Sequence, residues 1–366
     1  MRKRVVISAV NFTEGGPLTV LRDCLRAAAA TLPEDWVIEA LVHDAKLVNV
    51  PRVQLKEFPE AKKSWFKRLH LEWSGFRHAF RSEPVDLWLS LHDVTPRVDA
   101  TRQAVYCHNP APFYDLPLCE AFRDPKLWLF NRFYGQLYGA FIRHNTWVIV
   151  QQQWLRDAFK QRYGALPVVV ANPDVVAIPT RTATPTKLKS SVYIFLYPTL
   201  PRVFKNVETV LDAMLLLAAD GLTGVELRVT LKGDENAYAR RLYERYHDTP
   251  GVRFIGRQTA EEMVEQYAGA SAVLFPSKLE TWGLPVSEAK AWGKPLLVAD
   301  LSYAYETVGD YDQVGFLSAT EPEIWAQEMT AMVRGEWRPD GGKAPSVDAP
   351  YVNNWPDLWA LLIKDL

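Results

Sequence analysis

Residues 274–295 read Leu274-Phe-Pro-Ser-Lys-Leu-Glu280-Thr-Trp-Gly-Leu-Pro-Val-Ser-Glu288-Ala-Lys-Ala-Trp-Gly-Lys-Pro295. The apolar start predicts a buried strand, the middle a loop, and the last part a helix that begins near Leu284. Pro285 suits the first turn of that helix and Gly293 the position after its end. A strand followed by a loop and a helix is the repeating unit of parallel α/β sheets. The segment therefore predicts an α/β fold, with Glu280 in a loop at the carboxyl end of a strand.

The same alternation of short β-branched runs and helical patterns extends over the whole chain. Strands are predicted at residues 4–10, 36–42, 85–91, 102–107, 146–150 and 167–171, and again at 192–197, 225–231, 252–255, 271–275, 295–299 and 314–318. Helices are predicted at residues 17–32, 206–219, 236–247, 259–268, 284–292 and 322–334. One of these helices begins with a capping box formed by Thr259 and Glu262. The pattern predicts two doubly wound, Rossmann-like domains in tandem.

The expected domain boundaries follow from a Pro- and Thr-rich stretch at residues 179–187, which has little to bury. We expect an N-terminal domain at 1–180, a linker at 181–190, a C-terminal domain at 191–345, and a C-terminal tail with a helix at 346–366.

The loop and helix of residues 280–288 combine an anion site with two carboxylates. The backbone N–H groups of Gly283 and Leu284 point out of the predicted helix N-terminus, where an anion is stabilised. Glu280 and Glu288 can only accept hydrogen bonds when they are ionised, so they suit a ligand that also carries hydroxyl groups. A sugar and a ribose meet that demand. The alternative is that both glutamates are solvated surface residues.

Glu280 and Glu288 have the E-x7-E spacing, and with the neighbouring Pro-Ser, Trp-Gly-Leu-Pro, Glu-Ala and Gly-Lys-Pro they resemble the signature of retaining family-4 (group 1) glycosyltransferases. The resemblance implies a GT-B fold, in which two Rossmann-like domains face each other across a cleft. It also implies that Glu288 binds the ribose of a nucleotide-sugar, that Glu280 contacts the donor hexose, and that Thr281, Gly283 and Leu284 border the donor.

Two further segments of the C-terminal half match this family less closely. Arg202 and Lys205 follow the first strand of the C-terminal domain, where the family places two cations that neutralise the donor diphosphate. Lys205 with Asn206 fits the lysine position, whereas Arg202 is shifted from the usual arginine position. Gly233 resembles a family glycine beside the nucleobase. Solvated charges and an ordinary turn are the alternatives.

The N-terminal half is expected to hold the acceptor. Gly15 and Gly16 form a glycine loop after the first strand that resembles the loop of the family and can approach a phosphate or a sugar. It is not a G-x-G-x-x-G fingerprint. His108 ends another strand and matches a histidine that many family members place beside the reacting sugar. His92 and Asp93 also end a strand, with a structural role as the alternative.

Composition limits the class of protein. The 366 residues carry a net charge of -1 and 12% aromatic residues, which excludes a disordered chain and argues against a protein that mainly coats nucleic acid. Residues 1–180 carry 23 Lys and Arg against 18 Asp and Glu, whereas the remainder carries 19 against 25. Three cysteines, with no C-x-x-C or Cys/His cluster, favour a reducing cytoplasm and offer no metal site.

The segment from Lys62 to Arg81 predicts an amphipathic helix. Its apolar side chains Trp65, Leu69, Trp73, Phe76 and Phe80 recur at helical spacing, with Lys62, Lys63, Lys67, Arg68, Arg77 and Arg81 around them. Such a helix can lie in an anionic membrane interface, or its aromatic face can be domain core. The sequence thus predicts a cytoplasmic protein that is soluble or peripheral on the inner face of the membrane.

The resemblance implies a retaining hexosyltransferase that moves a sugar from a nucleoside-diphosphate sugar to a saccharide. The resemblance and the basic aromatic helix together make a lipid-linked glycan of a surface polysaccharide or lipopolysaccharide the expected acceptor. Neither a cofactor nor a metal is expected, because Lys205, Arg202 and the helix N-terminus supply the positive charge. The alternatives are a nucleotide-sugar epimerase of the same fold and a nucleotide-sugar sensor without turnover.

Overall fold

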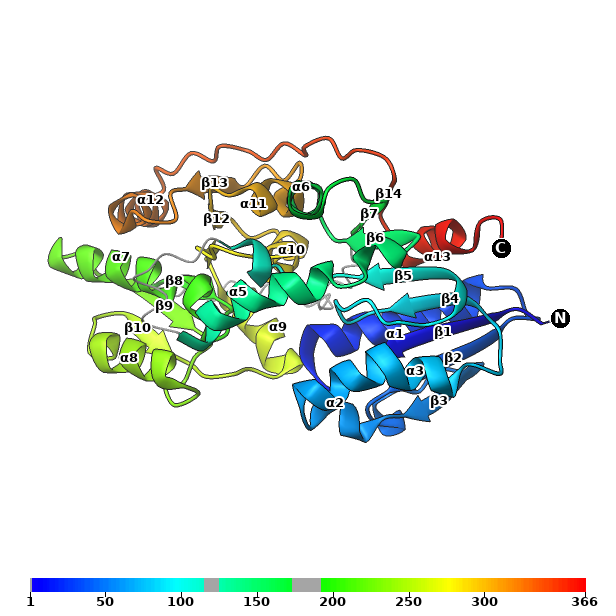
Figure 1. Ribbon diagram of the computed structural model, residues 1–366. Helices are drawn as coiled ribbons and strands as arrows, with labels where there is room; N and C mark the ends of the chain where they lie inside the picture. Colours follow the sequence, from blue (N-terminus) through cyan, green and yellow to red (C-terminus); the bar gives the residue numbers. More distant parts are fainter. Residues whose placement is uncertain (1, 115–124, 173–191) are drawn as a thin grey trace. The chain divides into compact units, whose positions relative to one another are not determined.

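The computed structural model describes residues 2–114, 125–172 and 192–366. These residues form two compact units. Unit 1 comprises 2–114, 128–172 and 347–366, and unit 2 comprises 192–346 together with 125–127. Each unit has its own parallel sheet with helices packed on it (Figure 1). The expected α/β class is confirmed, while the expected linker at 181–190 lies outside the described residues.

The sheet of unit 1 has eight strands in the order β14-β7-β6-β5-β4-β1-β2-β3, and every pair is parallel. The strands are β1 Arg4–Ala9, β2 Val37–Val42, β3 Val53–Glu57, β4 Val85–Ser90, β5 Ala100–Tyr106, β6 Trp147–Val150, β7 Val168–Ala171 and β14 Tyr351–Val352. The helices are α1 Gly15–Thr31, α2 Trp65–His70, α3 Phe76–Ala79, α5 Pro125–Gly139, α6 Gln153–Tyr163 and α13 Trp355–Ile363. Strand order reverses between β1 and β4, at the centre of this sheet.

Both faces of this sheet are buried along strands such as β1 and β7, which explains their largely apolar sequences. Alternate residues of a strand point to opposite faces. On β1, Val5 and Ile7 lie in the cluster that α1 and α13 cover, whereas Val6 lies with Phe76 and Trp88 in a cluster on the other face. A single-sided sheet would have needed polar residues at every second position.

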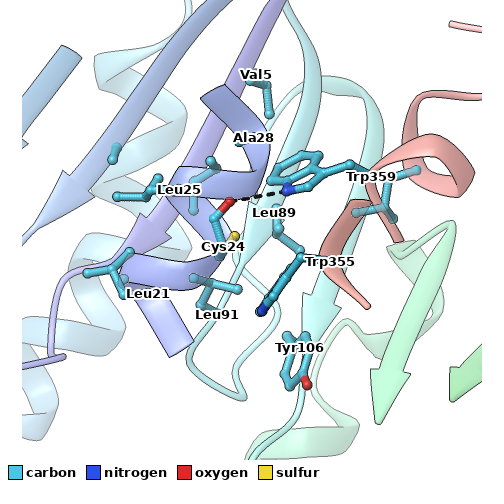
Figure 2. Packing of buried hydrophobic residues seen from close by; sticks show 14 of the residues in the cluster. Val5, Leu21, Cys24, Leu25, Ala28, Leu89, Leu91, Tyr106, Trp355 and Trp359 are labelled. Atoms are coloured by element: carbon cyan, nitrogen blue, oxygen red, sulfur yellow. Dashed lines mark hydrogen bonds between the residues drawn. The ribbon is translucent and has the colours of Figure 1, made fainter. Parts of the chain in front are cut away.

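The C-terminal tail belongs to unit 1, a placement that the sequence did not predict. The structure confirms a helix in it, α13, which packs against α1 (Figure 2). The indole N–H of Trp359 donates to the carbonyl oxygen of Cys24 at 3.2 Å, and Trp355 stacks on Tyr106 with ring centroids 5.6 Å apart. Fully buried Arg156 donates to the backbone oxygens of Asp348 and Pro350, beside the point where β14 joins β7.

The sheet of unit 2 has six parallel strands in the order β10-β9-β8-β11-β12-β13. The strands are β8 Tyr193–Tyr197, β9 Val225–Val229, β10 Val252–Phe254, β11 Ala272–Phe275, β12 Leu296–Ala299 and β13 Val314–Leu317. The helices are α7 Val207–Ala219, α8 Ala237–Tyr246, α9 Ala260–Gly269, α10 Leu284–Ala291, α11 Ser302–Val308 and α12 Pro322–Arg334. This order is that of a doubly wound nucleotide-binding sheet, and it reverses between β8 and β11.

Most predicted elements are confirmed within one or two residues of their predicted ends, and so is the capping box of Thr259 and Glu262 at the start of α9. The prediction missed β3, β14, α6 and α11. β14 and α11 are short, β3 is largely exposed with polar Gln54 and Lys56 at alternate positions, and most residues of α6 are polar or charged. Their hydrophobic pattern is therefore weak.

The segment 62–81 is not one amphipathic helix with a cationic outer face. Its helical part divides into α2, a π-helical turn at Leu71–Gly75, and α3. Phe76 and Phe80 are buried in the core, so this part of the aromatic face is domain structure. Arg68 is also buried, with 6% of its surface exposed, which corrects its predicted place among the outer cations.

Arg68 belongs to a buried polar network at the carboxyl end of β4. Its guanidinium donates to Oε1 of Glu72 at 2.7 Å and to the carbonyl oxygen of His92 at 2.6 Å. The ring of His92 lies 3.2 Å from the same guanidinium and 2.8 Å from the hydroxyl of Ser8. Burial holds the pKa of His92 well below its usual value and raises the pKa of Glu72 to about 7, against the opposing pull of Arg68.

The raised pKa of Glu72 predicts a pH-dependent term in stability. Between its usual pKa of 4.5 and about 7 the folded chain binds a proton that the unfolded chain has lost, so this term weakens as pH rises through that range. In wild type we expect ionisation of Glu72 to lower the free energy of unfolding by on the order of 3 kcal/mol between pH 5 and pH 7.5. Glu72→Gln cannot ionise and should not show this decrease.

The measurement is urea unfolding of both proteins at several pH values, with exposed Glu34→Gln as the matched control. Buried neutral His92 acts in the opposite direction in the same range, so the difference between variant and wild type is the informative quantity. Parallel stability curves for Glu72→Gln and wild type would contradict the assignment.

Candidate functional site

The reversal of strand order in unit 2 places two loops side by side. One loop follows β8 and ends in a 3-10 turn at Val203–Lys205, and the other follows β11 and leads into α10. The N–H of Lys278 donates to the carbonyl oxygen of Phe204 at 2.7 Å, and the side-chain amide of Asn206 donates to the carbonyl oxygen of Pro276 at 3.0 Å. These bonds join the two loops at the carboxyl edge of the sheet, where doubly wound folds bind ligands.

Lys205 and Glu280, predicted separately from two motifs, form an ion pair across these loops. Their side chains are 15% and 13% exposed. The ammonium group also lies 5.6 Å from the centroid of the Phe275 ring. The structure thus brings a cation and a carboxylate together in a largely desolvated place, where each charge needs its partner.

Gly283 shapes the start of α10. Its φ of 83° is in the left-handed region, and a Cβ atom there would lie 3.1 Å from the ring of Phe275. Pro285 occupies the first turn of the helix, as predicted. Gly283 is buried, Leu284 is exposed and Thr281 is half-buried. The helix N-terminus therefore belongs to the loop that carries Glu280, so an anion site and the ion pair are neighbours along the chain.

Glu288 lies one turn further along α10 and is partly buried, which raises the pKa of its carboxyl group. The hydroxyl of Tyr267 on α9 donates to its Oε2 at 2.6 Å. The ring of buried Tyr267 stacks on Trp292. The sequence did not predict Tyr267, because a tyrosine on the inner face of an amphipathic helix is expected to be part of the hydrophobic core. One oxygen of Glu288 is thus held by the protein.

Arg202 and Gly233 differ from the other predicted residues of this unit. The side chain of Arg202 is exposed, and Arg202 precedes the 3-10 turn that carries Lys205. The N–H of Gly233 donates to the carboxylate of Glu235 at 2.8 Å, and a Cβ atom on Gly233 would lie 2.5 Å from Cβ of Tyr243. The turn and its packing therefore account for this glycine, and its contact with a nucleobase stays a prediction.

In unit 1 the carboxyl ends of β1, β4 and β5 carry the predicted residues. Gly15 and Gly16 are exposed at the start of α1, with open space around both and a φ of 66° at Gly15. His92 is fully buried in the network with Arg68, so it has a structural role. Asp93 follows it directly and is half-buried.

His108 lies at the end of β5 with its ring enclosed by protein. The ring stacks on Tyr106 with centroids 4.4 Å apart and meets Phe12 edge-on at 5.6 Å. Nε2 of the ring is buried without a partner in the described part of the chain. Burial lowers the pKa of His108, so the ring is neutral at neutral pH. A buried polar atom without a partner is unusual, and a bound hydroxyl group would satisfy it.

Two negative findings concern the described residues alone. No group of three or more His, Cys, Asp and Glu side chains among them is arranged to hold a metal ion. No helix in the ranges 2–114, 125–172 and 192–366 has the length and apolar character needed to cross a bilayer. Asp310 and Asp312, which have D-x-D spacing, are both exposed.

Residues 181–340 match the family model of glycosyl transferases group 1. The O-antigen chain mannosyltransferase B of Escherichia coli is 30% identical over 139 residues, which are 35% of this chain and 36% of that protein. The chain thus spans about a third of the length of this curated relative. The match confirms the predicted resemblance for the C-terminal half.

Solved structures share the fold of both units of this chain. Sucrose-phosphate synthase from Thermosynechococcus elongatus superposes with a TM-score of 0.69 at 15% identity, covering 92% of this chain and 90% of that one. The lipopolysaccharide outer core galactosyltransferase WaaB gives a TM-score of 0.64 at 13% identity, covering 92% and 91%. The predicted GT-B fold, with two Rossmann-like domains, is therefore confirmed.

Proposed function

We propose that this chain, which carries a glycosyl transferases group 1 domain over residues 181–340, transfers a hexose from a nucleoside-diphosphate sugar to a saccharide with retention of anomeric configuration. The observation that carries the proposal is the Lys205–Glu280 ion pair in the loops that lead to the N-terminus of α10. A diphosphate needs the cation and the helix N-terminus, and a sugar needs the carboxylate.

The two glutamates take different parts of the donor in this proposal. Tyr267 occupies Oε2 of Glu288 and leaves Oε1 to accept a hydrogen bond from a ribose hydroxyl. Glu280 accepts from a hydroxyl of the hexose, while Lys205 keeps N–H donors for the diphosphate beyond the one that it gives to Glu280. Glu280 is a positioning group for the sugar, since its charge is already paired.

The reaction proposed is a displacement on the same face of the sugar. The bond between the anomeric carbon and the acceptor oxygen forms as the bond to the diphosphate oxygen breaks, and the acceptor proton passes to the departing phosphate. Lys205 and the N–H groups at the start of α10 stabilise the charge that develops on the diphosphate. In unit 1, His108 can accept a hydrogen bond from a saccharide hydroxyl at Nε2, the ring atom that has no protein partner within the described residues.

The acceptor proposed is a lipid-linked glycan in surface-polysaccharide or lipopolysaccharide synthesis. The support comes from the names of two similar proteins, an O-antigen chain mannosyltransferase and a lipopolysaccharide outer core galactosyltransferase. An epimerase of the same fold would need an acid and a base around one sugar carbon. Paired Glu280 supplies neither role readily.

Incubation with UDP-glucose and with GDP-mannose, with and without lipid-linked saccharide extracts, tests the reaction. We expect release of a nucleoside diphosphate that increases with acceptor, a product whose anomeric configuration matches the donor by NMR, and no loss of rate in EDTA. An altered sugar that stays on the nucleotide would indicate an epimerase. Binding without release would indicate a sensor, and an inverted product would contradict the proposed displacement.

The role of Glu288 predicts a loss of donor affinity. Replacing it with alanine removes one charge-assisted hydrogen bond, worth roughly 1.5–3 kcal/mol, so UDP or GDP should bind at least about tenfold more weakly in calorimetry. Glu265→Ala on α9 removes an exposed carboxylate of the same charge and should leave affinity unchanged. Equal affinities in the two variants would place Glu288 outside the site.

A membrane partner is the second part of the proposal, and it rests on an exposed apolar surface of unit 1. The rings of Trp65 on α2 and Tyr134 on α5 are in edge contact at 5.5 Å, so the two helices are neighbours. The surface, here the α2–α5 patch, consists of Trp65, Phe66, Trp128, Leu129 and Phe133, which are 43% to 85% exposed.

Cations border the α2–α5 patch. Lys62, Lys63, Lys67 and Arg132 are all exposed, although Glu60 pairs with Lys63 and Lys67. Aromatic side chains beside lysines suit the headgroup region of an anionic bilayer. We propose that this patch docks on the inner face of the cytoplasmic membrane, where a lipid-linked acceptor would be presented.

The α2–α5 patch predicts salt-sensitive binding to vesicles that contain phosphatidylglycerol, and little binding to phosphatidylcholine. Phe66→Ser with Phe133→Ser should weaken sedimentation with these vesicles at least about tenfold, because two apolar side chains no longer insert. Their exposure means that the melting temperature should hardly change. Leu215→Ser, at an exposed position on α7, is the control. Undiminished binding of the double variant would remove the patch from the interface.

A further inference from the structure

Asp93 has a backbone conformation that residues other than glycine rarely adopt. Its φ is 72°, in the left-handed region. Asp93 follows β4 directly after buried His92, at the point where the strand order of unit 1 reverses between β1 and β4. Such a conformation persists only where the surrounding contacts impose it.

The carboxylate of Asp93 makes those contacts. Its Oδ1 accepts hydrogen bonds from the backbone N–H of His108 at 2.6 Å, the backbone N–H of Asn109 at 3.2 Å, and the hydroxyl of Tyr138 at 2.9 Å. Its Oδ2 accepts from the hydroxyl of Tyr134 at 3.0 Å. One side chain therefore joins the end of β4 to the end of β5 and to α5, through charge-assisted hydrogen bonds.

The ring of His108 is held by its aromatic neighbours. Tyr106 and Phe12 enclose the ring, and Nε2 is left without a partner among the described residues. The main chain of His108 is thus fixed by Asp93, and its ring by Tyr106 and Phe12. The position of Nε2 therefore depends on the carboxylate that holds the main chain of His108.

We propose that Asp93 is the positioning residue for His108, and that its left-handed backbone and its carboxylate act together to place Nε2 against the sugar. This inference rests on the proposed function, since it assumes that Nε2 meets a substrate. A turn that merely closes the sheet would not require a carboxylate with four donors. The backbone N–H groups of His108 and Asn109 lie beyond the end of β5, and Asp93 accepts from both, while the N–H of Asn109 also donates to the hydroxyl of Tyr138 at 3.1 Å.

Three variants separate positioning from folding. Asp93→Gly accepts the left-handed φ but removes the carboxylate. Asp93→Asn also tolerates that φ and keeps an oxygen that can accept from the two backbone N–H groups. Tyr134→Phe removes a hydrogen bond to Asp93 without touching the His108 loop, and serves as the matched control.

The first measurement is hydrogen exchange of the peptide that contains His108 and Asn109, which needs no substrate. We expect faster exchange there in Asp93→Gly, and exchange close to wild type in Asp93→Asn and Tyr134→Phe. Protection that is unchanged in Asp93→Gly would overturn the proposal.

The second measurement is kcat and KM for diphosphate release from UDP-glucose or GDP-mannose. A misplaced His108 should lower kcat about 100-fold in Asp93→Gly while KM for the donor, which unit 2 binds, changes little. Asp93→Asn should restore most of kcat. If His108→Ala lowers kcat but Asp93→Gly does not, the positioning role is wrong while the proposed function stands. If wild type releases nothing and His108→Ala matches it, the proposed function fails, and exchange alone decides whether Asp93 holds the loop.

Discussion

The hydrogen bonds between the loops after β8 and β11 are the constraint on which the donor side of this molecule depends. Parallel strands end at the same edge, and the reversal of strand order leaves these two loops as neighbours. Lys278 and Asn206 then join the loops through backbone oxygens. Only because the loops are joined can Lys205, 75 residues before Glu280, meet it in a largely buried ion pair.

In unit 1 a carboxylate that accepts hydrogen bonds, and not an ion pair between loops, joins neighbouring strand ends. There the neighbouring strand ends carry a neutral, buried His108 and a carboxylate that is saturated by four donors. The sheet beneath is completed by a segment far away in sequence, since β14 pairs with β7 and α13 covers α1. The core of unit 1 therefore needs both ends of the chain, which ties the site to the last twenty residues.

The sequence predicts this architecture well because buried parallel strands appear as short, strongly hydrophobic runs. In addition, the loop of Glu280 and the helix of Glu288 carry glycine and proline at positions that restrict the backbone to one conformation. It fails where tertiary contacts override local pattern. Arg68 lies at a helical position where a cation is expected on the surface, yet it is buried because it donates hydrogen bonds to a buried carboxylate and to a carbonyl oxygen. Tyr267 carries no motif, and the sequence identifies Asp93 only by its place with His92 at a strand end. The hydrogen-bond partners of Tyr267 and Asp93 lie 21 and 15 residues away along the chain, so the local sequence pattern does not indicate them.

The Lys205–Glu280 pair also bears on how a charged donor can enter a desolvated site. A buried ammonium without a partner is costly, and so is a buried carboxylate. In the proposed reaction the diphosphate supplies a new partner for Lys205 while sugar hydroxyls supply donors to Glu280, so neither charge is left alone at any stage. The ion pair thus holds both groups in position before the donor arrives, and the exchange of partners needs little reorganisation. A single free lysine at this place would have to be desolvated when the donor binds. The cost of that desolvation would reduce the binding energy that is available to stabilise the transition state.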